Sequence, residues 1–187
     1  SKTYGHMMVV RQPLGVCAAI IPWNMPVLIM GWKIGPVLAT GNTMIVKPST
    51  TAPLTCKALA GCLYRVGVPE SVLQLVTGSG EVVGEALARH RDIKSLSFTG
   101  AVPTGIQVAE HAAKTLKKTI LELGGSDAMI VCKDADLEAA AKGAVSGRFF
   151  NCGQTCTAIK RVFVDTSISA PFVKRVRELA DALQVGN

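Results

Sequence analysis

Short β-rich runs alternate with longer helical patterns along most of this chain, and the links between them are short. This alternation predicts a parallel sheet with helices on both faces. The β-rich runs are continuously apolar, as expected of strands that are buried on both sides. The fold class is therefore α/β with a doubly wound parallel sheet. The expected strands are Val16–Ile21, Thr43–Lys47, Val72–Thr77, Ile93–Phe98, Thr119–Leu123, Ala128–Val131 and Val162–Val164. The expected helices are Val27–Ala39, Pro53–Val66, Gly80–Ala88, Val102–Ala113, Leu137–Phe149 and Ile168–Leu183.

The ends of these helices carry separate signals. Asn24 stands before Met25 and Pro26, which is typical of a helix cap followed by an early proline, and residues 51–53 resemble a second such start. Gly41 and Gly67 follow helical patterns, as C-terminal glycines often do.

With 187 residues, the chain has room for one domain and part of another. The Gly-Gly-Ser break at residues 124–126 is the best boundary. We therefore expect a first domain over residues 1–124 and the start of a second α/β domain over residues 125–187.

Composition excludes several classes of function. No uncharged apolar run reaches the ~18 residues that a membrane span needs, and no basic-then-apolar leader opens the chain. We therefore expect a cytoplasmic protein with no membrane partner.

The net charge of +7 would attract an anion such as a dinucleotide. The basic residues are scattered and lack interleaved aromatic rings, so nucleic acid is not an expected partner.

Cysteine spacing argues against a metal site. Four of the six cysteines lie in apolar runs, as expected of reduced core residues in a cytosolic protein. Cys152 and Cys156 are four residues apart, but zinc would need a second pair or nearby histidines. The three histidines do not cluster in the sequence, so no metal is expected.

Glu122 and Cys156 are the most informative reactive side chains. Each lies beside glycines and ends an apolar run. A thiol can act as a covalent nucleophile, and a carboxylate can act as the base that activates water. Taken singly, each has an ordinary explanation as a strand end or a small core residue. The assignment therefore depends on the rest of the chain.

Two glycine-rich turns follow expected strands, at residues 77–80 and 98–105. Such turns expose backbone N–H groups at a helix N-terminus, where phosphate is favoured. Neither has the usual dinucleotide fingerprint, so each is weak evidence alone. Gly80 in the first turn is a candidate cofactor contact. Lys47 closes a β-rich run, and the carboxyl edge of an open α/β sheet is where ligands bind.

Five short motifs together resemble the aldehyde dehydrogenase superfamily. They are Pro-Trp-Asn at 22–24, Lys-Pro-Ser at 47–49, Phe-Thr-Gly at 98–100, Glu-Leu-Gly-Gly at 122–125 and Gly-Gln-Thr-Cys at 153–156. They occur in the family's order, and their spacings fit, with 23 residues from Asn24 to Lys47 and 34 from Glu122 to Cys156. The resemblance covers nearly the whole chain.

This resemblance implies a Rossmann-like cofactor domain, the start of a catalytic domain, and the NAD(P)-dependent oxidation of an aldehyde to a carboxylic acid. Cys156 would attack the aldehyde to give a thiohemiacetal and then, after hydride transfer, a thioester. The Asn24 amide and the Cys156 N–H would hold the oxyanion. Glu122 would activate the water that hydrolyses the thioester.

For the cofactor, the resemblance implies that Lys47 contacts the adenosine ribose and that Trp23 lies near the cofactor cleft. The turn that holds Gly100, Ala101 and Gly105 would meet the pyrophosphate. Ala101 stands where the family usually has serine, so one hydroxyl donor is missing and binding there depends on backbone N–H groups.

Thr50 stands where NAD-preferring members often have a glutamate that binds the ribose hydroxyls. A carboxylate there would repel a 2′-phosphate, whereas Thr50 with Lys47 and Ser49 would accept one. The expected cofactor is therefore NAD or NADP, with NADP favoured.

The positions beside the expected aldehyde site are apolar. Trp32 and Phe150 stand where members that act on carboxylated semialdehydes tend to have arginines. The chain therefore resembles members that oxidise apolar aldehydes. Met25 and Ile29, one helical turn apart, would extend this lining.

The family's chains are far longer than this one, so we expect a partial chain of an enzyme that is a homo-oligomer in its full-length form. Two alternatives stay open. One is a catalytically inactive fragment that binds a dinucleotide. The other is a thiol esterase that uses Cys156 and Asn24 without any dinucleotide.

Overall fold

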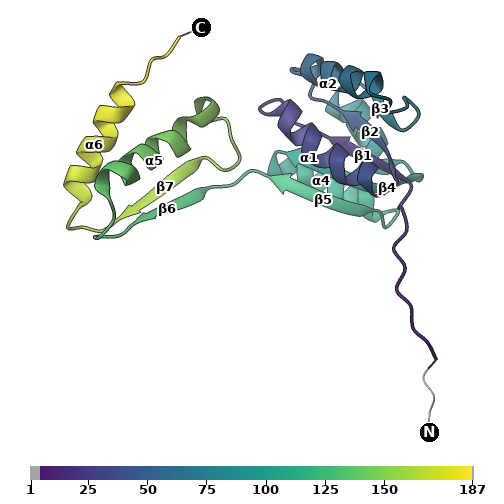
Figure 1. Ribbon diagram of the computed structural model, residues 1–187, viewed down its shortest axis with the longest axis horizontal. Coiled ribbons are helices and arrows are strands. Elements are labelled where there is room, and N and C mark those ends of the chain that lie inside the picture. The colour runs from purple at the N-terminus through teal and green to yellow at the C-terminus, as the bar shows by residue number, and fades with distance from the viewer. Residues whose placement is uncertain (1–4, 187) are drawn as a thin grey trace. The chain divides into compact units, whose positions relative to one another are not determined.

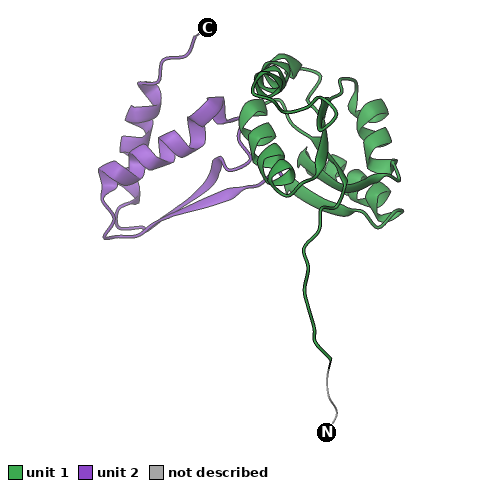
Figure 2. Cartoon of the chain, turned by 45° about the vertical axis from the view of Figure 1, so that its right-hand side comes forward, with its two compact units in different colours: residues 1–122 green, residues 123–187 purple. Residues whose placement is uncertain are grey.

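The structure of the protein is a computed structural model that describes residues 5–186. It divides into two compact units between Glu122 and Leu123 (Figure 2). The expected boundary after Gly124 lies two residues further along the chain. Residues 1–4 of the expected first domain and residue 187 of the second lie outside the described residues.

All the expected strands, and all the expected helices except Gly80–Ala88, are present as single elements with ends that differ by at most a few residues (Figure 1). The first unit contains β1 (Val16–Ile20), α1 (Pro26–Ala39), β2 (Thr43–Lys47), α2 (Pro53–Arg65), β3 (Leu73–Leu75), the π-helical turn η1 (Gly80–Gly84), α3 (Glu85–Arg89), β4 (Ile93–Gly100), α4 (Val102–Ala113) and β5 (Lys118–Leu123). The second contains β6 (Asp127–Val131), α5 (Leu137–Phe149), the 3-10 turn η2 (Phe150–Gly153), β7 (Ile159–Val164) and α6 (Ser169–Asp181).

The sheet of the first unit is parallel and has the strand order β3-β2-β1-β4-β5. The order changes direction at β1, and the crevice at such a switch point is where open α/β sheets bind ligands. In the register, Ile20 of β1 lies opposite Lys47 of β2 on one side and Phe98 of β4 on the other. The segments that follow these three strands therefore leave the sheet at the same edge.

Helices cover both faces of this sheet (Figure 2). On one face, α1 and α2 pack over a core in which Met30, Met44 and Leu73 are fully buried. On the other face, α3 packs against α4, and both contact β4. The predicted doubly wound α/β class is confirmed.

The glycines expected to end α1 and α2 do so through the same hydrogen-bond pattern. Gly41 and Gly67 are left-handed, with φ of 76° and 101°. The Gly41 N–H donates to Leu38 O and the Asn42 N–H to Val37 O, at 3.0 and 3.1 Å. This is a Schellman motif, which satisfies the last carbonyls of a helix.

The expected helix caps are wrong by one residue. Met25 takes the cap position of α1, directly before Pro26, and Asn24 lies one position earlier. Ala52 takes the same position in α2, before Pro53. In each helix a proline at the first position sets the φ angle of the helix start and has no N–H to satisfy. The Asn24 side chain is therefore not the cap of α1.

The expected helix Gly80–Ala88 is two elements, η1 and α3. Gly78, with φ of 145°, turns the chain into η1, and a Cβ added there would lie 2.4 Å from Val83 Cγ2. The Ser79 hydroxyl accepts a hydrogen bond from the Val82 N–H at 3.2 Å. η1 begins and ends on glycine, which has a low helix propensity.

The cysteines only partly follow the expectation of core residues. Cys17 and Cys56 are buried, but Cys62 and Cys132 are exposed. Cys62 lies on the outer side of α2, where the Arg65 guanidinium approaches its sulfur at 3.0 Å, and Cys132 directly follows β6. Apolar neighbours in the sequence therefore did not distinguish the cysteines that point into the core from those that point to the surface. Across residues 5–186, no helix is both long enough and apolar enough to cross a membrane.

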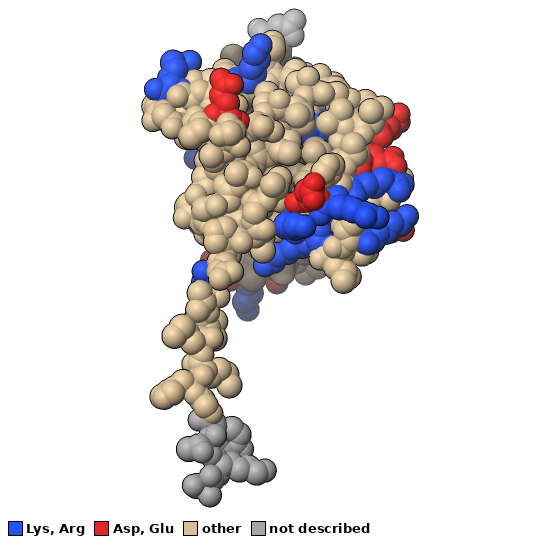
Figure 3. All heavy atoms as spheres, turned by 90° about the vertical axis from the view of Figure 1, so that its right-hand side faces the viewer, with Lys and Arg blue, Asp and Glu red and all other residues tan. Residues whose placement is uncertain are grey.

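Charged side chains in Figure 3 are mixed in sign. The largest group of lysine and arginine side chains in that view has aspartate and glutamate side chains among it and beside it. This face is therefore not a uniformly basic surface.

The second unit is a β6-α5-β7 crossover followed by α6. Its two strands are parallel, and Val131, Ala141, Ala144 and Phe172 form its core. Arg175 of α6 donates to both carboxylate oxygens of Glu138 of α5, at 2.6 and 2.9 Å. This pair joins the two helices on the surface of the unit.

The Glu138 pair gives a prediction about acid stability. Hydrogen bonds from Arg175 and Lys142 lower the pKa of Glu138 to about 2. A lowered carboxyl pKa stabilises the fold above the unfolded-state pKa, and the contribution is lost as the pH falls toward the folded-state value. Replacing Glu138 with Gln should lower the melting temperature at pH 7 slightly, because the pair is exposed. The difference from the unchanged protein should vanish by about pH 2; a constant difference across pH would contradict this account.

Candidate active site

Cys156 lies in the loop that links α5 to β7, within the second unit, and its side chain is exposed. Before it, Asn151, Cys152 and Gly153 are all left-handed, with φ of 51°, 57° and 74°. Two successive non-glycine residues in this region are costly, and such strain clusters at functional sites. A Cβ at Gly153 would lie 3.0 Å from Arg148 O, so this motif position requires glycine.

The Glu-Leu-Gly-Gly motif reaches the Cys156 loop through its second glycine. A Cβ added at Gly125 would lie 3.2 Å from the Cys156 carbonyl oxygen. Lys160 of β7 donates to the Gly125 carbonyl, and Arg161 donates to the Ser126 carbonyl at 2.7 Å. The glycine therefore permits a close backbone contact between two motifs that are about 30 residues apart in the chain.

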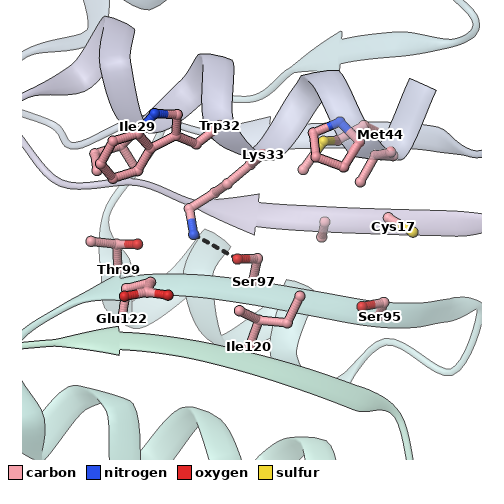
Figure 4. A pocket seen from close by; sticks show the side chains of 13 residues that line it. Cys17, Ile29, Trp32, Lys33, Met44, Ser95, Ser97, Thr99, Ile120 and Glu122 are labelled. Atoms are coloured by element: carbon pink, nitrogen blue, oxygen red, sulfur yellow. Dashed lines mark hydrogen bonds between the residues drawn. The ribbon is translucent and has the colours of Figure 1, made fainter. Parts of the chain in front are cut away.

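Glu122 lies near the end of β5, in the first unit, and lines a cavity of about 180 Å³ beneath α1 (Figure 4). Lys33 of α1 points into the same cavity, is 8% exposed, and donates from Nζ to Ser97 Oγ at 2.5 Å. Burial lowers the pKa of Lys33, and the charge of Glu122 opposes this by raising it. An acidic and a basic group thus share one cavity.

Sequence reasoning missed Lys33, Ser97 and Thr99. Lys33 was only an interruption in an apolar run, and its partner Ser97 is 64 residues away. The sequence did contain a signal for Ser97 and Thr99. In β4, Ser95, Ser97 and Thr99 place a hydroxyl at every second position, although the strand was expected to be buried. Alternate residues face the same side of a sheet, so this spacing predicts a polar stripe.

Asn24 and Trp23 lie in the link from β1 to α1, at the carboxyl edge of the sheet. Asn24 is half-buried, and the indole of Trp23 is 51% exposed. The structure therefore brings both residues to the ligand-binding edge that the topology defines.

Lys47 ends β2 at this edge and is buried at 3% exposure. Its Nζ donates to the neighbouring Pro48 carbonyl at 3.0 Å, and burial lowers its pKa. Beyond it, the Ser49 hydroxyl lies 2.9 Å from the Thr51 hydroxyl, and Thr50 is exposed. The structure thus places Lys47, Ser49 and Thr50 together after one strand.

A second cavity, of about 320 Å³, opens between η1–α3 and α4, over the carboxyl ends of β1 and β4. Its lining includes Ile20, Phe98, Gly80, Glu81, Gly84 and Val108. Gly84 lies over Lys47, because a Cβ added there would be 3.9 Å from the lysine side chain. The cavity has an apolar floor at the switch point, beside the lysine.

The turn between β4 and α4 bounds the same region. A Cβ at Gly100 would lie 2.6 Å from Phe98 Cζ, so a larger residue here would require the Phe98 ring to move. Ala101 is the cap residue of α4, and the Gly105 N–H donates to Ala101 O at 2.9 Å. The N-terminus of this helix of 12 residues favours an anion. The cavity, the lysine and the helix N-terminus fit a dinucleotide.

The expected substrate-lining residues differ in exposure. Trp32 and Phe150 are each 63% exposed, and Met25 packs against the core beneath α1. Ile29 is 6% exposed and belongs to that core, so we assign it to packing rather than to substrate contact.

Comparisons with known proteins identify the family to which the chain is similar. The model of the aldehyde dehydrogenase family matches residues 1–187. A mitochondrial aldehyde dehydrogenase of Leishmania tarentolae is 47% identical over 180 residues, which are 96% of this chain and 36% of that protein. The NADP/NAD-dependent aldehyde dehydrogenase PuuC of Escherichia coli (strain K12) is 44% identical over 197 residues, covering 100% of this chain and 40% of PuuC.

A solved structure gives the same result. The crystal structure of PnpE in complex with nicotinamide adenine dinucleotide has a TM-score of 0.92 and 41% identity, over 94% of this chain and 36% of that one. The chain thus spans a little over a third of the length of these proteins. Since the family model matches the chain from end to end, the resemblance inferred from the five motifs is confirmed, and the chain belongs to the aldehyde dehydrogenase family.

Proposed function

We propose that the protein carrying this chain oxidises an aldehyde to a carboxylic acid with NAD or NADP, through a thioester on Cys156. The observation that carries the proposal is the exposed thiol of Cys156 in a strained loop, at the motif position of a chain of this family. PuuC is named as an NADP/NAD-dependent aldehyde dehydrogenase, and PnpE was solved with NAD.

Each proposed role follows from the chemistry of the side chain. The Cys156 thiolate attacks the carbonyl carbon, and a thiohemiacetal forms on sulfur. The Asn24 amide N–H and the Cys156 backbone N–H donate to the oxygen as it gains charge, and one such donor contributes roughly 3–4 kcal/mol to the transition state. The bound dinucleotide supplies the hydride acceptor. Glu122 then takes a proton from the water that hydrolyses the thioester, and the thiolate leaves.

The residues around the second cavity are proposed to hold the dinucleotide. Ile20, Phe98 and Gly80 line the space for the adenosine half, and Lys47 lies beside it. The α4 N-terminus, with Gly100, Ala101 and Gly105, would hold the pyrophosphate through backbone N–H groups. Trp23 lies at the same edge of the sheet.

Cofactor choice gives a second prediction. Replacing Thr50 with Glu should raise the ratio of kcat/KM for NAD to that for NADP by about ten-fold or more, because a carboxylate beside the ribose repels a 2′-phosphate. Steady-state rates with both cofactors measure this ratio. Thr50→Gln, which has similar size and no charge, is the matched control. A ratio unchanged by Glu would show that Thr50 lies away from the ribose.

For the substrate, we propose an apolar aldehyde. Trp32 and Phe150 present exposed aromatic surfaces, and neither can pair with a carboxylate. Met25 is the third proposed contact. The expected partners are therefore a small aldehyde and, by resemblance to the family, further copies of the same chain; we propose the cytoplasm as the location, which suits six free thiols.

One assay separates this function from the two alternatives. Absorbance of the reduced nicotinamide is followed with a panel of aldehydes and both cofactors. Aldehyde-dependent reduction supports the dehydrogenase. Turnover of activated esters without dinucleotide, and without any reduction, supports the thiol esterase. Dinucleotide binding without either reaction supports the inactive binding module.

A further inference from the structure

Cys156 lies at the first central position of a tight turn that runs from Thr155 to Ala158 and leads directly into β7. The Ala158 N–H closes this turn by donating to the Thr155 carbonyl at 3.4 Å. Backbone hydrogen bonds are most often about 2.9–3.0 Å long, so this one restrains the turn only weakly. Ala158 is fully buried, which fixes the end of the turn but leaves its centre to other contacts.

The weak turn bond matters because of the group that it restrains. The Thr155 carbonyl and the Cys156 N–H belong to one planar peptide group, so they can only rotate together. This N–H is one of the two donors proposed above for the aldehyde oxygen. Such a donor is effective only when it is already aimed at the developing charge. Catalysis by this N–H therefore calls for a further restraint on the Cys156 backbone.

A restraint of this kind lies against the other peptide group of Cys156. A Cβ added at Gly125 would be 3.2 Å from the Cys156 carbonyl oxygen, so this oxygen packs directly against the Gly125 backbone. Close packing on one side limits the rotation of the carbonyl and, with it, the backbone conformation of Cys156. The aim of the Cys156 N–H therefore depends on how firmly residues 125 and 126 are held.

Lys160 and Arg161 hold these two residues through their successive carbonyl groups. The Lys160 amine donates to the Gly125 carbonyl, and the Arg161 guanidinium donates to the Ser126 carbonyl from Nε and Nη2, at 3.2 and 2.7 Å. Hydrogen bonds from charged donors are stronger than those from neutral donors. Both side chains are exposed, so these bonds add little to overall stability, and their main effect is to fix a position.

An irregularity in the strand pairing accounts for the direction of the Lys160 side chain. β6 and β7 run side by side as a parallel pair (Figure 1), in which Asp127 lies opposite Ile159 but Ala128 lies opposite Arg161. Lys160 is therefore an extra residue in β7, a β-bulge. Neighbouring residues of a regular strand face opposite sides of the sheet, whereas a bulge redirects one of them. Lys160 and Arg161 can thus both reach the same short segment.

We propose that Lys160 is a positioning residue for the oxyanion donor: it ties the Gly125 carbonyl to β7 and so keeps the Cys156 N–H aimed at the aldehyde oxygen. Arg161 holds the next carbonyl and supports the same geometry. The inference rests on the proposed function of Cys156. All these residues belong to the second unit. The Lys160 amine is bonded to a backbone carbonyl rather than to sulfur, so its role differs from activation of the thiol.

The test compares two reactions of Cys156 in the whole protein. Aldehyde oxidation develops negative charge on oxygen, whereas alkylation by iodoacetamide displaces iodide from carbon and needs no oxyanion donor. Lys160→Met, which keeps the length of the side chain without its charge, should slow the burst of reduced cofactor by about ten-fold. This is a part of the about 10²–10³-fold loss that follows removal of a whole donor. Alkylation of Cys156, followed by peptide mass spectrometry, should keep its rate, and Lys160→Arg should restore the burst.

Lys174 offers a matched control, because it is an exposed lysine on α6 in the same unit. Lys174→Met should leave the burst and the alkylation rate unchanged. An unaltered burst in Lys160→Met would overturn the inference. Equal slowing of burst and alkylation would overturn it too, because the lysine would then act on the thiol or on the whole loop. If the unchanged protein gives no burst although iodoacetamide labels Cys156, the proposed function fails, and this inference fails with it.

Discussion

Replacing Cys156 with Ala in the whole protein is expected to lower kcat for aldehyde oxidation by about 10⁴-fold or more. The thiol is the atom on which both proposed intermediates form, and removing a covalent nucleophile typically removes most of the catalytic advantage. Production of reduced cofactor with a saturating apolar aldehyde measures the loss. Affinity for the dinucleotide should stay within about two-fold, because the proposed cofactor residues lie in the first unit.

Cys152 offers a matched control for this substitution. It is also an exposed free thiol, four residues earlier in the same strained loop. Cys152→Ala should keep aldehyde oxidation within a few-fold of the unchanged protein. If Cys152→Ala and Cys156→Ala lose activity equally, the loop rather than one sulfur is required. If Cys156→Ala keeps full activity, the covalent mechanism is excluded.

Replacing Glu122 with Gln is expected to separate the two halves of the reaction. The first turnover should still release reduced cofactor in a burst, because acylation uses Cys156 and Asn24. The following steady state should be slower by about 10²–10⁴-fold, the usual contribution of a general base. Stopped-flow absorbance records both phases in one trace.

The structure offers a control variant and a second readout for the Glu122→Gln experiment. Glu110 is an exposed carboxylate on α4, in the same unit, and Glu110→Gln should leave both phases unchanged. The charge of Glu122 raises the pKa of Lys33, so Glu122→Gln should also lower that pKa further. A normal steady-state rate in Glu122→Gln would contradict the assignment of the base, whereas loss of the burst would place Glu122 in the acylation step.

Much of the fold could be predicted because its determinants are local. β2, α4 and α5 have the expected bounds. Proline, glycine and Asp136, which favour the start or end of a helix or strand, lie near their ends. Asp136 caps α5 by accepting from the Ala139 N–H at 3.1 Å. The parallel sheet with helices on both faces also follows from the alternation of strands and helices.

The errors have physical reasons. Asn24 resembled a helix cap, but a proline after Met25 starts α1 by itself and leaves Asn24 one residue earlier. β7 begins at Ile159, three residues before the expected start, because Lys160 and Arg161 are charged yet bond to the backbone of residues 125 and 126. Such contacts depend on tertiary structure and leave no periodic signal in the chain.

In the candidate site too, residues marked by local sequence were predicted, whereas residues defined by tertiary contacts were missed. Motif positions predicted Cys156, Glu122 and Lys47 as site residues, because their glycine and proline neighbours have conformational requirements that the sequence displays. Lys33 was missed because its hydrogen-bond partner, Ser97, lies on β4, 64 residues further along the chain. The buried polar stripe of β4 was visible in the sequence, but its meaning required knowing which helix covers it.

The central claim is that the aldehyde carbon becomes covalently attached to one sulfur atom. The most direct measurement is intact and peptide mass spectrometry of Glu122→Gln after mixing with an apolar aldehyde and the oxidised cofactor. The account predicts a single adduct whose mass is that of the aldehyde less two hydrogen atoms, located on the peptide that contains Cys156. A cofactor burst with no such adduct, or with the acyl group on another residue, would contradict it.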